Sequence, residues 1–195
     1  PGLRPELTWA YELGYQQRLP GDGGLLELRA YYDDIADRTE KVPLRDAIGL
    51  YAASGNVDTA RRYGAEAKAS VRLASIGLRN ALLSLRYNWQ QSQVVDPFTG
   101  APRRISADRG NNYDLGFRHD LIRQGASYGL TYKATGGAVI ISDLPVTARI
   151  EIKPILEIFA EKKLGRAITL RLEGQNVGGA HEIQDRTLYA LNAID

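Results

Sequence analysis

Three closely spaced carboxylates are the first residues that could do chemistry. Asp33, Asp34 and Asp37 lie within five positions, and hard cations bind several carboxylate oxygens at once. No spacing of the EF-hand type follows them. We therefore interpret them as solvated residues at the entrance to a loop, with a cation site as the alternative.

A second group consists of three arginines, Arg103, Arg104 and Arg109. A planar guanidinium pairs well with carboxylate and phosphate groups, so these side chains could hold an anionic ligand. Short runs of like charge are more often a solvated surface. The solvated surface is the favoured interpretation, and the anion site is the alternative.

Little else in the sequence points to catalysis or to a bound cofactor. The chain has no Cys, so a disulfide, a thiolate metal site and a Cys nucleophile are excluded. His119 and His181 have no evident partner, and we interpret both as non-functional. The Gly-rich stretches 20–24 and 136–137 lack the strand-to-helix context of a phosphate loop and predict turns. We expect no enzyme, no cofactor and no metal.

Charge and hydropathy narrow the classes of protein further. Lys and Arg total 25 and Asp and Glu total 23, a balance that does not predict a nucleic-acid partner. The longest stretch without these residues is 47–57, shorter than the roughly 20 residues of a transmembrane helix. The mean hydropathy of −0.31 does not exclude a membrane β-barrel, because residues facing its lumen are polar.

The elements that must position these residues show a period of two. In residues 81–92, Leu85 and Tyr87 share one face while Arg86 and Asn88 share the other, as side chains of a strand do. A helix would spread the apolar residues around its whole circumference. The sequence therefore predicts an all-β fold. The pattern occurs in residues 7–19, 24–35, 62–73, 81–92, 111–121, 126–134, 147–158 and 166–176.

The predicted connections alternate between short and long, which indicates an antiparallel up-and-down meander of about eight strands with all tight turns at one end. Pro154 weakens the strand that contains it. The short turns are 20–23, 74–80, 122–125 and 160–165, and the long connections are 36–61, 93–110, 135–146 and the segment from 177 onward.

Three features favour lipid over a protein core as the environment of the apolar face. The strands are about as long as tilted membrane-spanning strands. Trp and Tyr gather near strand ends, as at a membrane interface. Loop length differs between the two ends, as in outer-membrane barrels. A soluble β-barrel or sandwich that binds a hydrophobic small molecule stays open as an alternative.

Several short motifs resemble the barrel domain of TonB-dependent outer-membrane receptors. Leu-Arg-Pro-Glu at 3–6 leads into a Tyr-Glu-Leu-Gly strand within 9–15, as in that family. Residues 28–37 resemble the next strand running into an extracellular loop, and 62–66 resemble the following strand start. Residues 170–177 resemble a strand near the end of the barrel.

The resemblance implies that residues 1–195 are a fragment of one barrel domain. Such receptors have about 22 strands around a plugged lumen, and eight strands cannot supply these. We expect a C-terminal-side portion of the barrel without the plug, without a separate second domain and without the closing strand.

The resemblance also implies a function: TonB-dependent uptake of a scarce ligand, usually a ferric siderophore, across the bacterial outer membrane. The implied partners are outer-membrane lipid, the ligand and, through parts outside this chain, the TonB complex. A passive porin-like channel is the first alternative. We expect a polar lumen wall that contains Arg86, Arg118, Arg149 and Arg171, and no ligand-binding residue is assigned.

Overall fold

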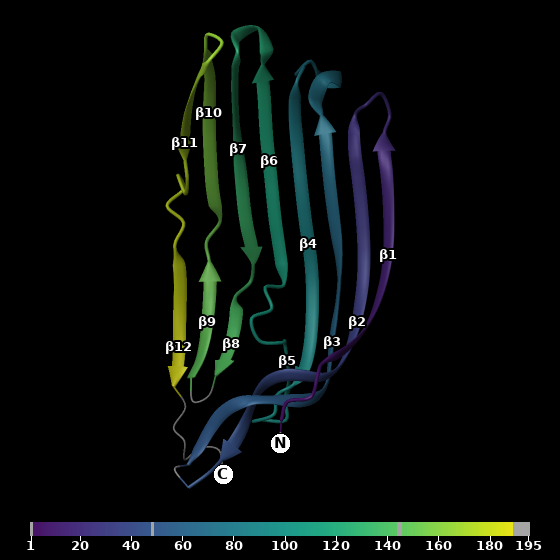
Figure 1. The fold of residues 1–195 in the computed structure, drawn as a ribbon, viewed down its shortest axis with the longest axis vertical. Coiled ribbons are helices and arrows are strands. Elements are labelled where there is room, and N and C mark those ends of the chain that lie inside the picture. The colour runs from purple at the N-terminus through teal and green to yellow at the C-terminus, as the bar shows by residue number, and fades with distance from the viewer. Residues whose placement is uncertain (1, 48, 144–145, 189–195) are drawn as a thin grey trace.

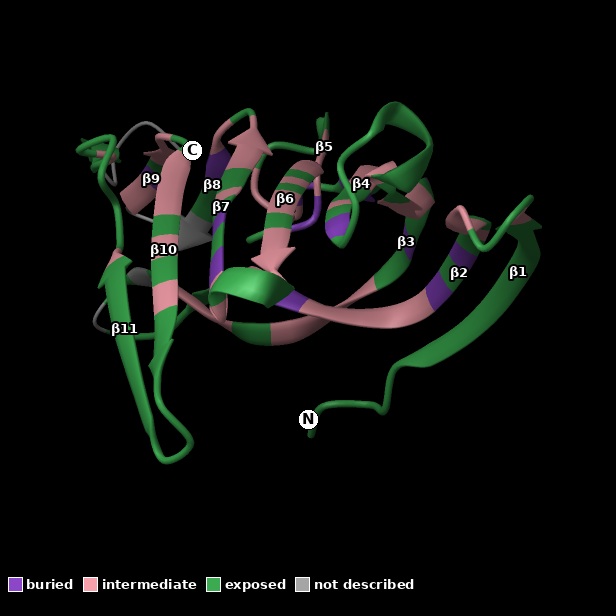
Figure 2. Ribbon diagram, turned by 90° about the horizontal axis from the view of Figure 1, so that it is seen from above, coloured by how far each residue is buried: buried purple, intermediate pink, exposed green. Residues whose placement is uncertain are grey.

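The computed structural model describes residues 2–47, 49–143 and 146–188. A curved antiparallel sheet in the order β1-β2-β3-β4-β6-β7-β10-β11 dominates it, with β5 paired to β4 (Figures 1 and 2). The sheet is open, with β1 and β11 at its edges. The strands are β1 (Leu7–Leu19), β2 (Gly24–Arg45), β3 (Leu50–Arg72), β4 (Ala81–Val95), β5 (Pro102–Arg103), β6 (Asn111–Leu121), β7 (Ala126–Gly136), β8 (Val139–Asp143), β9 (Val146–Ile152), β10 (Ile155–Leu164), β11 (Ile168–Gly174) and β12 (Glu182–Leu188).

The meander prediction is confirmed, and the tight turns gather at one end of the sheet (Figure 1). We call this the short-turn end and the opposite end the long-loop end. Two of the turns are short 3-10 helices, η1 (Leu73–Ile76) and η2 (Ile122–Gln124). Gly77 and Gly125 terminate them with φ of 89° and 58°, a left-handed conformation that glycine adopts without strain. No helix in the described ranges is long and apolar enough to cross a membrane.

The long connections contain more strand than we predicted. Residues 36–61 are mostly a continuation of the β2–β3 hairpin, paired out to Arg45 and Leu50. The segments 93–110 and 135–146 contain β5 and β8, and β12 lies beyond residue 177. The predicted turn at 160–165 is wrong, because β10 continues to Leu164.

The predicted strand 147–158 breaks at Lys153 and Pro154, since proline has no N–H to donate to a ladder. Before the break, β9 belongs to a separate three-stranded sheet in the order β12-β9-β8. After it, β10 pairs with β7 and β11 in the large sheet.

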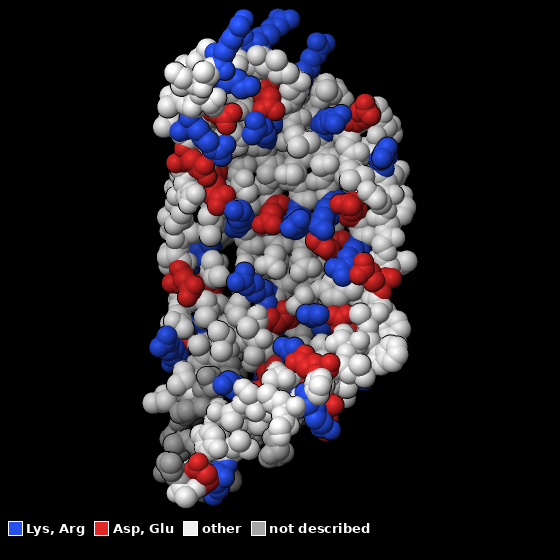
Figure 3. All heavy atoms as spheres, viewed as in Figure 1, with Lys and Arg blue, Asp and Glu red and all other residues white. Residues whose placement is uncertain are grey.

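The register aligns the alternating residues into rows across the large sheet. One row on the first face joins Leu85, Leu115, Tyr132 and Leu156. A row on the opposite face carries charged residues of both signs, seen as bands of red and blue in Figure 3. Its members are Glu27, Lys68, Arg86, Asp114 and Lys133.

Burial is reversed relative to a water-soluble sheet. Large apolar side chains of the first face are exposed, for example 76% for Leu13 and 65% for Trp9. The buried cluster of Ile35, Ala60, Val94 and Ile105 lies at the long-loop end, on the polar concave face. We call this polar face the inner face and the apolar one the outer face.

Close packing on the inner face depends on glycine at one position in particular. A Cβ at Gly129 would lie 2.6 Å from the ring of Phe159, so the missing side chain makes room for that ring. The guanidinium carbons of Arg118 and Arg171 lie 5.4 and 4.9 Å from the ring centroid, within the range of a cation–π interaction.

Candidate functional site on the inner face

A polar pocket of about 450 Å³ lies on the inner face at the long-loop end. Strands β1 to β4 form its floor and the connection between β5 and β6 forms one side. Its polar side chains include both carboxylates and arginines, which suits a ligand with charged groups. The pocket is lined by Glu6, Thr8, Ile35, Arg38, Arg62, Asn88, Gln90, Asn112 and residues 105–110.

The structure separates the three aspartates that the sequence places together. Asp33 is buried on the inner face, and its carboxylate lies 2.7 Å from Arg62. The alternation of the strand turns Asp34 to the exposed outer face. Asp37 has a φ of 53° and pairs with Arg4 at 2.8 Å. In the described part of the chain, no group of three or more His, Asp or Glu could hold a metal ion.

Arg103 is neither a solvated charge nor a free anion receptor. Its Nε donates to Asp96 at 2.5 Å and its Nη2 donates to Glu40 at 3.1 Å. Only 17% of its side chain is exposed, and 2% of that of Glu40. Arg103 therefore ties the β2–β3 hairpin to the connection after β4.

Arg104 also has a structural role. Its Nη2 donates to the carbonyl of Gln90 at 2.7 Å and lies 3.5 Å from Asp108. The carboxylate of Asp108 in turn accepts hydrogen bonds from Gln90 and Ser92 of β4. These contacts hold the connection between β5 and β6 against the wall beside the pocket.

Arg109 differs from the other two arginines. It is exposed, lines the pocket and forms no hydrogen bond or ion pair with the residues that the structure describes. Of the three candidates, it is therefore the one whose guanidinium is open to a ligand.

Two carboxylates at this end have lowered pKa values. Burial would raise the pKa of Asp96, but hydrogen bonds from Arg103 and from the N–H groups of Phe98 and Thr99 outweigh burial, so the net pKa falls. The pKa of Glu6 is lowered chiefly by the N–H of Thr39, with Arg38 adding to the effect. Both groups are therefore held in the charged form.

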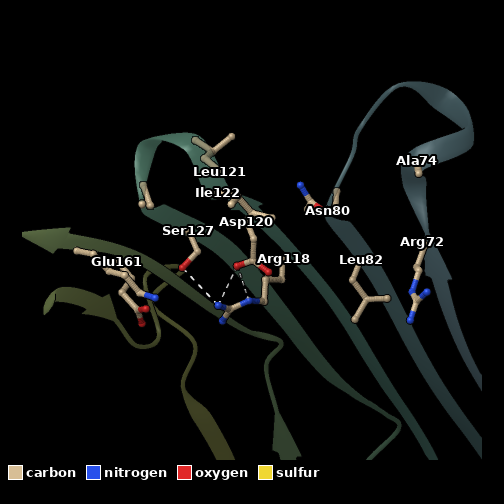
Figure 4. Close-up of a pocket in the computed structure, with 14 residues that line it drawn as sticks. Arg72, Ala74, Asn80, Leu82, Arg118, Asp120, Leu121, Ile122, Ser127 and Glu161 are labelled. Carbon is tan, nitrogen blue, oxygen red and sulfur yellow. Dashed lines mark hydrogen bonds and ion pairs between the residues drawn. The ribbon is translucent and has the colours of Figure 1, made fainter. Parts of the chain in front are cut away.

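A second pocket of about 710 Å³ lies at the short-turn end (Figure 4). Arg118 projects into it, 2.9 Å from Asp120 and 3.4 Å from the hydroxyl of Ser127. Arg72, Glu161 and Lys163 also line this pocket. Its charged groups belong to the wall strands and their turns, so it forms the inner rim at this end.

We predicted four arginines on the polar lumen wall. Three of them, Arg86, Arg118 and Arg171, lie in strands of the large sheet. Arg86 lies 3.9 Å from Glu66, and Arg171 lies 3.4 Å from Glu161. Arg118 lines the rim pocket. Arg149 lies in β9 of the three-stranded sheet and not in the large sheet, because the chain breaks at Pro154.

The histidines have structural surroundings. His119 lies with Nδ1 3.1 Å from the hydroxyl of Tyr128 and Nε2 3.1 Å from the carbonyl of Arg79. Our expectation that it has no partner is therefore wrong, and the ring links β7 to the turn before β4. His181 precedes β12, with Nδ1 3.5 Å from the carbonyl of Gly179.

Sequence reasoning missed the partners that hold the site together. Glu40 and Asp96 were not singled out, because they lie 63 and 7 positions from Arg103 within predicted loops. Gln90 shares the polar register of Arg86 and Asn88 in residues 81–92, and that alternation is sufficient to locate it on the inner wall.

The comparison with known families decides between a soluble and a membrane sheet. A family model described as TonB dependent receptor-like, beta-barrel, matches residues 1–177. The chain belongs to this receptor family. Its members are receptors of the bacterial outer membrane that take part in transport. The exposed apolar face of the TonB-dependent receptor chain is thus the lipid-facing surface and the polar face lines the lumen. Searches of the curated proteins and of the solved structures found no match.

Proposed function

We propose that the 195 residues form part of the wall of a larger outer-membrane barrel. In this proposal the complete receptor imports a scarce small ligand with energy from the TonB complex, and the ligand is a ferric siderophore. These residues constitute barrel wall alone, with the plug supplied by other parts of the receptor. The role is transport, with no catalytic step.

The observation that carries the proposal is the reversed burial of the sheet. Its apolar face is exposed and its polar face is curved inward, with the long-loop end partly covered by its own hairpin. A lipid-facing wall around a polar passage has this arrangement. A soluble barrel with a hydrophobic ligand would need the apolar face inside.

The guanidinium of Arg109 has no partner among the described residues, which favours an anionic ligand in this pocket. Arg62 and Arg38 line the same pocket, although their partners Asp33 and Glu6 neutralise them in part. A ferric chelate with carboxylate or catecholate oxygens would gain charge-assisted hydrogen bonds from Arg109.

The function is tested by uptake of iron-55 chelates in the bacterium that encodes the receptor. Under iron limitation, we expect saturable uptake of one anionic ferric chelate that disappears when either the receptor gene or TonB is deleted. Uptake that is unsaturable and survives loss of TonB would indicate the porin-like channel instead. Recovery of the protein in a soluble fraction would overturn both.

The role of Arg109 is tested by Arg109→Gln in the full receptor. Loss of a charge-assisted hydrogen bond should raise the Kd for the anionic chelate about tenfold, while a neutral hydroxamate chelate keeps its affinity. Arg123→Gln in η2 is the matched control, because it removes the same charge at the short-turn end. An unchanged Kd for the anionic chelate in Arg109→Gln would contradict this assignment.

A further inference from the structure

The segment before β1 lies against the β2–β3 hairpin on the concave side of the sheet (Figure 1). Arg4 is held there through both its backbone and its side chain. Its N–H donates to Oδ1 of Asn56 at 2.7 Å, and its carbonyl accepts from Nδ2 of Asn56 at 2.9 Å. Its guanidinium lies 2.8 Å from the carboxylate of Asp37.

Glu6 makes a second set of contacts with the same hairpin. Its carboxylate accepts hydrogen bonds from Arg38 at 2.9 Å and from the N–H of Thr39 at 2.9 Å. Thr39 is the register partner of Asn56. All these contacts therefore fall on one short stretch of the hairpin, at residues 37–39 and at Asn56 opposite.

At Asp37 the strand reverses which residues face inward. Its φ of 53° is left-handed, a conformation that Asp tolerates better than most residues. Before it, Asp33 and Ile35 are buried on the inner face; after it, Arg38 lines the inner pocket and Glu40 is buried against Arg103. Beyond this level the hairpin leaves the wall and crosses the concave side (Figures 1 and 2).

The hairpin is longer than the membrane requires. Its strands have 22 and 23 residues, whereas roughly 9–11 residues cross a bilayer. A straight continuation would project into the medium and leave the inner pocket uncovered. The contacts of Arg4 and Glu6 fall at Asp37, the left-handed residue of β2, and at the two residues after it.

We propose that residues 3–6 act as a latch that holds the β2–β3 hairpin bent across the barrel mouth. Arg4 and Glu6 form ion pairs with Asp37 and Arg38 of the hairpin, and Arg103 forms an ion pair with Glu40. Release of the latch lets the hairpin pivot at Asp37 toward the straight path of its strands. Access to the inner pocket is thereby controlled by ion pairs that are partly exposed.

The test measures the bend directly in the purified full receptor. Ser54→Cys on the distal part of β3 and Ser75→Cys in η1 carry nitroxide labels for distance measurement by electron spin resonance. The 195 residues contain no Cys, so the pair is unique within them. A straight β3 would place Ser54 roughly 60 Å from the end of the strand at Arg72, at about 3.3 Å per residue, and the bent hairpin gives a shorter distance.

The decisive variant is Arg4→Glu, which sets two carboxylates against each other at Asp37. We expect the population at long distance to rise about fivefold, the effect of losing one or two partly exposed pairs. Arg4→Lys keeps the charge and should keep the wild-type distribution. Glu12→Arg opposite Arg29 reverses a charge of the same kind within the wall, and should also leave the distance unchanged.

A second readout is hydrogen exchange at the Thr39 amide, which donates to Glu6. Glu6→Gln should accelerate this exchange and leave the amides of β1 unchanged. Unaltered distances in Arg4→Glu together with unaltered Thr39 exchange in Glu6→Gln would overturn the latch. Neither readout requires a transported ligand, so the latch and the proposed transport can fail separately.

Discussion

Two regions of the chain extend beyond the wall at the long-loop end, and they do so in different ways. The β2–β3 hairpin remains one ladder from Gly24 and Val71 to Arg45 and Leu50, with Asp37 and Asp58 left out of the pairing. On the other side of the sheet, three successive strands are interrupted at a similar level, between β7 and β8, between β9 and β10, and between β11 and β12.

The two constructions need different kinds of support. The hairpin bends as a unit at Asp37, so ion pairs at the bend set its direction. The three-stranded sheet is joined to the wall through backbone links such as Lys153 N–H to His181 O at 3.1 Å and Val177 N–H to Leu156 O at 2.9 Å. The first region should respond to charge changes, and the second to changes in backbone chemistry.

The strongest expected effect is at Arg103. Arg103→Ala removes the arginine that Glu40 and Asp96 share and leaves Glu40 only a longer contact with Arg38 at 3.7 Å. Loss of one member of a buried pair costs about 3–5 kcal/mol. We expect a loss near the lower bound, because part of the guanidinium is exposed. The free energy of unfolding in detergent, measured by urea titration, provides the check. The side chain of Arg171 is 47% exposed, so Arg171→Ala should cost under about 1 kcal/mol. Equal losses of unfolding free energy in the two variants would contradict the special role of the buried pair at Arg103.

The wall below both regions should behave as a single surface. Leu28→Arg in β2 and Leu130→Arg in β7 each place a charge on the outer face. Each should cost about 2–4 kcal/mol near the bilayer midplane, measured by unfolding from lipid vesicles. The control Thr131→Arg on the inner face should cost little. A low cost at Leu130 alone would show that the wall at β7 does not face lipid.

Acid should release the hairpin and spare the three-stranded sheet. The folded-state pKa values of Asp96 and Glu6 lie below their ordinary values of 3.8 and 4.5. Their pairs therefore contribute stability that is complete above those ordinary values and is lost as pH falls through the folded-state values. We expect the long-distance population of the Ser54 and Ser75 label pair to rise reversibly below about pH 4.

The three-stranded sheet provides the contrast for this acid response. Glu151 also has a lowered pKa, through the hydrogen bond from Lys153 two residues away. Its protonation frees no other element, so a label pair across β9 and β12 should keep its distance at the same pH. Opening of both regions together would show that acid causes global unfolding and not a selective release of the β2–β3 hairpin.

Local alternation is sufficient to predict the wall, because side chains in a strand alternate regardless of distant contacts. Leu85, Arg86 and Tyr87 are on the faces we expected. The inward turn of Arg38 and Glu40 was not foreseen, because one left-handed residue at Asp37 shifts the pattern. Asp is a residue that permits this conformation, but its presence alone does not require it.

The site is less predictable than the wall because its pairs join distant segments. Arg103 is singled out as a charge, yet its partner Glu40 lies 63 positions away and is buried in the bent hairpin. Pro154 signalled a weakened strand, but the separate sheet also depends on β12, which pairs with β9 from beyond the predicted strands. Long-range pairing of this kind leaves no periodic trace in the sequence.

The smallest expected effect compares two prolines. Pro43 lies within the paired hairpin, opposite Ala52, whereas Pro154 separates β9 from β10. Pro154→Ala restores an N–H at the break, which lets the two strands join. We expect a stability change within about 0.5 kcal/mol but slower hydrogen exchange for the amides at 153–156. Pro43→Ala should leave the exchange of its neighbours unchanged, because the residues on either side of Pro43 are already paired. Slower exchange at both sites, or at neither, would mean that proline does not account for the difference between the two regions.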